Sequence, residues 1–88
     1  MFQLFRSLRR LARGEKLQTA DVMIHNGQTK MSLTLKRETK SAALYVVLAN
    51  ISAGNKQYSV FEPGEFDQFA DAVRTIQSSL RQYPQATD

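Results

Sequence analysis

The chain has 88 residues, which is enough for one small domain and too few for two. Apolar residues make up 42% of it, which excludes wholesale disorder, and the absence of cysteine excludes disulfides, thiol nucleophiles and cysteine-bound zinc. The net charge of +4 lies in residues 1–13, because the rest of the chain has eight basic and eight acidic residues.

Residues 1–13 are predicted to form a short basic amphipathic helix that ends at Gly14. Four arginines gather opposite its apolar side: Arg6, Arg9, Arg10 and Arg13. Three interpretations fit this segment. It is a helix packed on the domain or on a partner, a mitochondrial targeting segment, or an arm that binds a membrane surface or nucleic acid. We expect the domain itself to span residues 15–84, followed by a tail at 85–88.

No apolar run reaches the roughly 18 residues that a membrane-spanning helix needs. A chain without cysteine also suits a reducing compartment. We therefore expect an intracellular protein of the cytoplasm or nucleus, or of the mitochondrion if residues 1–13 are a targeting segment.

Two strands are predicted over residues 19–25 and 28–37. Asn26-Gly27 lies between them and is the strongest two-residue hairpin signal, because both residues tolerate a positive φ. The second strand alternates between apolar and polar residues, with Met31, Leu33 and Leu35 on one face. This alternation is typical of an antiparallel sheet with one solvated face.

A polar turn at residues 38–41 leads to a third strand at 43–51, which is apolar on both faces. We assign one alternating set to the core: Leu44, Val46 and Leu48. The other set then lies on the opposite face, where a partner subunit or a ligand would cover it: Tyr45, Val47 and Ala49. A second turn at residues 52–55 joins this strand to a fourth at 56–61.

An amphipathic helix is predicted over residues 64–82, introduced by Pro63 and ended by Pro84. Its apolar residues form one stripe that is expected to close the core: Phe66, Phe69, Ala70, Val73, Ile76 and Leu80. The fold class is therefore α+β, a four-stranded antiparallel meander followed by one C-terminal helix (ββββα), with the short basic helix at the N-terminus.

The residue types needed for catalysis are missing. His25 is the one histidine and flanks a turn, where histidines are usually solvated. The acids at the start of the helix suit the helix dipole better than an acid/base pair. No cluster has metal-ligand spacing. We therefore expect a non-catalytic protein without a metal or cofactor.

A binding function has more support. Five basic residues of the strand region are predicted to contact phosphates: Lys30, Lys36, Arg37, Lys40 and Lys56. Tyr45 and Tyr58, or Phe61, are candidates for stacking on bases. Basic groups that follow a phosphate backbone, together with rings for stacking, are what single-stranded nucleic acid requires.

Four strands followed by a helix resemble a Pur repeat, of the purine-rich-element-binding family, and are similar to the Whirly and transcriptional-coactivator folds. The resemblance covers residues 19–80. It depends on the passage 58–76, where Tyr-Ser-Val-Phe leads into Phe66, Phe69 and Val73, and on the lysines of the second strand. It implies single-stranded DNA or RNA bound on the sheet, and a homodimer because only one repeat is present.

The alternative function is a protein–protein interaction domain. Its docking surface would be the apolar Tyr45/Val47 face of the sheet together with the N-terminal helix, because apolar patches on small proteins often mark interfaces.

Overall fold

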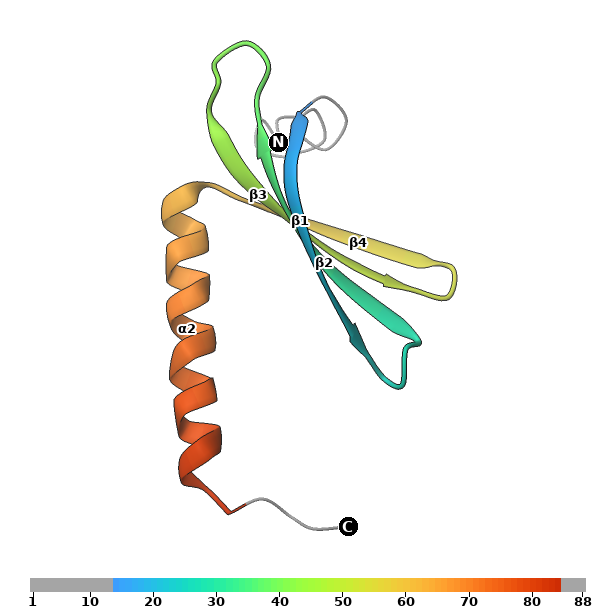
Figure 1. Ribbon diagram of the computed structural model, residues 1–88, viewed down its shortest axis with the longest axis vertical. Helices are drawn as coiled ribbons and strands as arrows, with labels where there is room; N and C mark the ends of the chain where they lie inside the picture. The colour runs from blue at the N-terminus through green and yellow to red at the C-terminus, as the bar shows by residue number, and fades with distance from the viewer. Residues whose placement is uncertain (1–13, 85–88) are drawn as a thin grey trace.

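The computed structural model describes residues 14–84, which form a four-stranded antiparallel sheet followed by one helix (Figure 1). The elements are β1 (Glu15–Ile24), β2 (Thr29–Arg37), β3 (Leu44–Ser52), β4 (Asn55–Phe61) and α2 (Pro63–Gln82). The strands lie in the sheet in chain order. The predicted α+β class and ββββα order are therefore confirmed. The helix predicted in residues 1–13 and the tail at 85–88 lie outside the described residues.

β1 begins at Glu15, earlier than the predicted residue 19. Glu15 pairs with Arg37 and Lys16 with Lys36, and a β-bulge follows between Lys16 and Gln18. The bulge inserts one extra residue, which breaks the strict alternation of side chains. The period-2 pattern therefore does not predict the part of the strand before the bulge.

The β1–β2 connection is longer than the predicted two-residue hairpin. His25, Asn26 and Gly27 all have positive φ. The Gly27 amide donates to the Ile24 carbonyl at 3.2 Å, and the Gln28 amide to the His25 carbonyl at 3.1 Å. Two overlapping turns therefore reverse the chain. The Asn26-Gly27 turn is present within them, and β2 begins one residue later than predicted.

Strand pairing defines the two faces of the sheet, because directly opposed residues project their side chains to the same side. The face toward α2, here called the helix face, carries most of the apolar residues: Met31, Leu33, Leu35, Val46, Leu48 and Phe61. The opposite face, here called the lysine face, carries two kinds of residue: Lys16, Lys30, Lys36 and Lys56 with Tyr45, Val47 and Ala49.

The start of α2 is fixed to the sheet by three phenylalanines. The ring of Phe61, at the end of β4, lies 5.3 Å from that of Phe69 and 5.9 Å from that of Phe66. The Glu62 amide donates to Oε1 of Glu65 at 2.8 Å, as in a capping box, and Pro63 takes the first helical position. The helix therefore begins at a defined place and angle.

Further along, α2 separates from the sheet (Figure 1). Val73, Ile76 and Leu80 continue the stripe of Phe66 and Phe69, but they are exposed. The prediction that the whole stripe closes the core is therefore wrong beyond the second turn. The helix leaves β4 at an angle that carries its later turns away from the helix face.

Burial within β3 is the reverse of the prediction. Tyr45 is 0% exposed, and Val47 and Ala49 are also buried, whereas Leu44 is 44% exposed. Val46 and Leu48 are half-buried. Because α2 covers little of the helix face, the apolar residues there remain partly open. On the opposite face, Gly14 lies against the buried Tyr45 side chain.

Within residues 14–84, no helix is both long enough and apolar enough to cross a membrane.

Candidate nucleic-acid interface

The lysines of the lysine face lie in two rows that run across the strands. One row contains Lys16, Lys36 and Tyr45. The other contains Met23, Lys30, Ile51 and Lys56. Lys30 and Lys36 are six positions apart on β2, so the rows are separated by roughly 20 Å at the rise of a β-strand. The sheet thus presents positive charge at both ends of one face.

Two further rows lie between the lysine rows and are mostly small, hydroxylic or apolar. Thr19, Thr34, Val47 and Val60 form one of them, and Asp21, Ser32, Ala49 and Tyr58 the other. Asp21 is the acid within these four rows. It is exposed and accepts a 2.5 Å hydrogen bond from the Ser32 hydroxyl on the neighbouring strand.

Lys36 and Lys16 are close enough to repel each other. Burial lowers the pKa of the Lys36 ammonium below its ordinary value of 10.5, and the charge of Lys16 lowers it further. A positive charge in partly desolvated surroundings favours an anion placed beside it. This end of the face is therefore suited to a phosphate group.

The other end of the face combines lysines with an exposed ring. Lys56 is exposed and Lys30 half-buried. Tyr58 lies two positions from Lys56 along β4, on the same face, and is 50% exposed. A ring between positive groups on a sheet is the arrangement that lets a base stack while its phosphates are neutralised.

Tyr45 does not have the predicted role in stacking. Its ring is fully buried, so it has no open face for a base. Gly14 lies against it, and a Cβ at Gly14 would overlap the Tyr45 hydroxyl. Tyr45 is a packing residue of the lysine face, and only glycine fits beside it without a shift.

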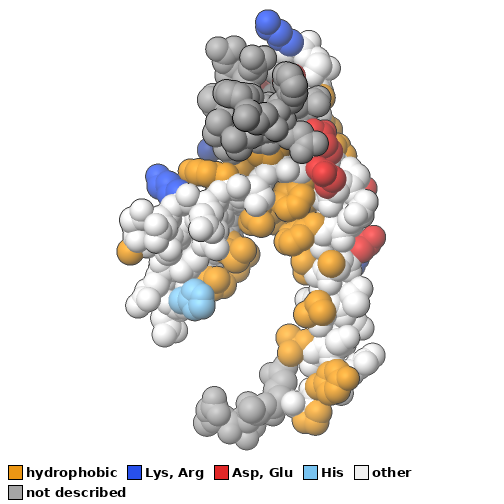
Figure 2. Space-filling model, turned by 180° about the vertical axis from the view of Figure 1, so that it is seen from behind, with side chains coloured by type: hydrophobic (Ala, Val, Ile, Leu, Met, Phe, Trp, Pro, Cys, Tyr) orange, Lys and Arg blue, Asp and Glu red, His pale blue; other side chains and the backbone are white. Residues whose placement is uncertain are grey.

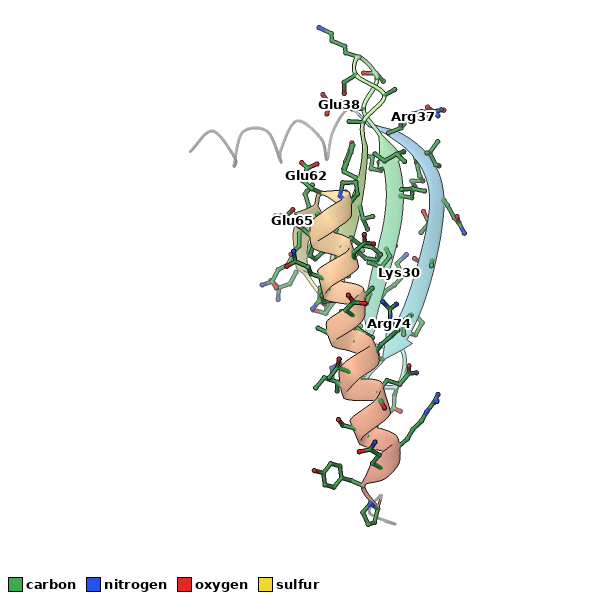
Figure 3. The ribbon with its side chains drawn as sticks, turned by 90° about the vertical axis from the view of Figure 1, so that its left-hand side faces the viewer. Lys30, Arg37, Glu38, Glu62, Glu65 and Arg74 are labelled. Carbon is green, nitrogen blue, oxygen red and sulfur yellow. The ribbon has the colours of Figure 1, made fainter. Side chains whose placement is uncertain are left out.

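Arg37 and Lys40 are also placed away from the lysine rows. Arg37 is the next residue after Lys36 and projects to the other face, where its guanidinium forms a 2.8 Å ion pair with Glu15. Figure 3 shows Arg37 and Lys30 toward opposite ends of the sheet. Lys40 lies in the exposed turn between β2 and β3. Of the predicted phosphate contacts, the structure gathers Lys30, Lys36 and Lys56.

Lys16 is the residue that sequence patterns missed. It lies before the bulge, outside the predicted strand, and its pairing with Lys36 brings it onto the lysine face. The arginines of residues 1–13, predicted as a binding arm, lie outside the described residues.

The Tyr45/Val47 face is not an open apolar patch, because both side chains are buried. The protein-docking function predicted for this face stays a prediction, but Tyr45 and Val47 are not exposed for it. The exposed apolar residues lie instead on α2 and on the helix face, among them Val22, Val73, Ile76 and Leu80.

Residues 14–84 contain no group of three or more histidine, aspartate or glutamate side chains that could hold a metal ion. His25 is exposed in the β1–β2 turn. No family model, curated protein or solved structure matches the chain.

Proposed function

We propose that this protein is a non-catalytic module that binds single-stranded nucleic acid on the lysine face and acts as a homodimer. The observation that carries the proposal is the strand register, which brings Lys16, Lys30, Lys36 and Lys56 onto one face together with exposed Tyr58. The resemblance to Pur and Whirly domains supports the same ligand class.

The two ends of the face have different roles in this proposal. Lys30, Lys56 and Tyr58 form the end where a base stacks on the tyrosine and the lysines neutralise its neighbouring phosphates. Lys36 and Lys16 bind a phosphate farther along the strand, where an anion relieves their mutual repulsion. The mostly uncharged rows between them let the backbone cross the sheet without reading base edges, so little sequence preference is expected.

Titration of a fluorescently labelled oligothymidylate at two salt concentrations tests the proposal. Binding should weaken as salt rises, since counterions are released when lysines neutralise phosphates. Tyr58→Ala should weaken binding by about 5- to 150-fold, which corresponds to the roughly 1–3 kcal/mol of one stacked base. Lys56→Ala should weaken it and reduce the slope of log K against log salt by about 0.7.

Matched controls come from residues away from the lysine face. Tyr83→Ala removes an exposed ring at the end of α2, and Lys40→Ala removes an exposed lysine of the β2–β3 turn. Neither substitution should change the affinity by more than about twofold. Tyr83 lies away from the lysine face, and the long-range attraction between Lys40 and a phosphate is screened at physiological salt. Absence of binding at low salt, or equal losses in Tyr58→Ala and Tyr83→Ala, would contradict the proposal.

A further inference from the structure

One row of the lysine face combines an acid, a small buried surface and an aromatic ring. The row runs across the four strands from Asp21 on β1, over Ser32 and Ala49, to Tyr58 on β4. Asp21 and Tyr58 are exposed, whereas Ser32 and Ala49 between them are buried, at 9% and 8% exposure. The two exposed side chains therefore stand at the ends of a low surface made of small residues. This row is called the Asp21–Tyr58 row below.

The carboxylate of Asp21 is held by the neighbouring strand. Its Oδ1 accepts the 2.5 Å hydrogen bond from the hydroxyl of Ser32, a buried residue. β1 is an edge strand, but this bond lies on its inner side, toward β2. A charge that serves only to discourage pairing at an open edge needs no such partner. The exposed carboxylate is therefore positioned over the lysine face, and its second oxygen can accept a hydrogen bond from a ligand.

An acid at this place is unfavourable for nucleic acid unless the ligand donates a hydrogen bond to it. Asp21 is the one acid within the four rows of the lysine face, and its charge repels the phosphates that the lysines attract. Phosphate oxygens and the ring oxygen of the sugar only accept hydrogen bonds. The donors of a single strand are the edges of its bases and, in RNA, the 2′-hydroxyl. Because the proposed binding does not read base edges, the donor that remains is the 2′-hydroxyl.

The spacing of the Asp21–Tyr58 row suits one nucleotide. Three strand spacings separate Asp21 from Tyr58, which is roughly 14 Å between their Cα atoms. Both side chains take up part of this distance, so a base stacked on Tyr58 can place its ribose over Ser32, beside Asp21. Lys30 and Lys56 lie in the adjacent row, two positions along β2 and β4 or roughly 7 Å away, where they neutralise the phosphates of that nucleotide.

We infer that Asp21 selects RNA over DNA by accepting a hydrogen bond from the 2′-hydroxyl of the nucleotide that stacks on Tyr58. Ser32 is a positioning residue, because its hydroxyl fixes the carboxylate and need not touch the ligand. This selection rests on the proposed function and names the substrate class of the same face. DNA binds through the same stacking and the same lysines, but it leaves the repulsion by Asp21 uncompensated.

Titration of the full chain with three labelled oligomers tests this selection. Oligouridylate carries the 2′-hydroxyl, oligodeoxyuridylate lacks it, and 2′-fluoro oligouridylate keeps the sugar pucker of RNA but has no proton to donate at that position. The bases are identical, so no base contact distinguishes the three oligomers. Oligouridylate should bind at least about 10-fold more tightly than either of the others, as expected for a hydrogen bond to a charged acceptor.

Substitutions then assign the preference to Asp21. Asp21→Ala should reduce the ratio of the DNA to the RNA dissociation constant to about 1, and it should not weaken DNA binding, since a repulsion is lost. Ser32→Ala should lower the ratio only partway. Asp67→Ala is the matched control and should leave the ratio unchanged. Figure 2 shows acidic side chains along the outer side of α2, and Asp67 is an exposed acid of that helix, outside the lysine face.

The three oligomers decide the matter on the unsubstituted chain even if Asp21→Ala fails to fold. Equal affinity for all three would overturn the selection of RNA and leave single-strand binding on the lysine face intact. A preference that 2′-fluoro oligouridylate shares would belong to the sugar pucker, and one that survives in Asp21→Ala would belong to another residue. Either result would overturn the role of Asp21. Absence of binding to all three at low salt would contradict the proposed function itself, and the selection with it.

Discussion

The two faces of the sheet differ in burial, and their residue composition does not predict which face is more buried. The helix face has more large apolar residues, yet its side chains are only partly covered in a single copy. The lysine face carries four lysines, yet it contains the buried side chains Tyr45, Val47 and Ala49. Burial therefore follows the neighbours that the fold supplies, and the more apolar face is the less covered one.

The sharpest test of this difference is a pair of adjacent residues on β3. Tyr45→Ala should lower the free energy of unfolding by about 3–5 kcal/mol, because it removes a fully buried ring. Leu44→Ala, on the helix face and 44% exposed, should cost about 1 kcal/mol or less. Urea unfolding followed by circular dichroism measures both. A larger loss for Leu44→Ala would show that the helix face holds the core.

A second test concerns how tightly the lysine face is closed at its edge. Gly14→Ala should destabilise the fold by about 1–3 kcal/mol, since the added methyl overlaps the buried Tyr45 hydroxyl. Gly64→Ala is the matched control, because open space surrounds that position. It lies in the first turn of α2 and should be neutral or slightly stabilising. Equal effects in the same unfolding assay would mean that Tyr45 is loosely held.

The smallest expected effect is electrostatic, and it separates the two causes that lower the pKa of Lys36. Nuclear magnetic resonance titration of its side chain should give a pKa below 10.5, and Lys16→Gln should raise it only partway, because burial is the larger cause. A lowered lysine pKa means that charged Lys36 weakens folding at neutral pH. The penalty fades as the pH rises through the folded-state pKa toward 10.5. Complete restoration by Lys16→Gln would contradict burial as the main cause.

Local patterns in the sequence predicted much of the candidate site. Lys30, Lys36, Lys56 and Tyr58 share a face because alternation along β2 and β4 places them there. Arg37 was predicted to join this set, but it follows Lys36 directly along β2 and therefore projects to the other face. Lys16 was missed because a bulge interrupts its strand, and Tyr45 was misassigned because both sets of β3 residues are apolar.

The sequence by itself determined the five elements, their order and the start of the helix. These depend on contacts between near neighbours along the chain, such as side-chain alternation, the Asn26-Gly27 turn and the Glu62–Glu65 cap. Only the tertiary structure decided which face of the sheet is closed and how far α2 follows it. Those outcomes depend on the angle at which α2 leaves Phe61, and on the packing of Gly14 against Tyr45 across the sheet. Neither angle nor long-range contact is encoded in a local pattern, because each depends on residues that are distant in the chain and close in space.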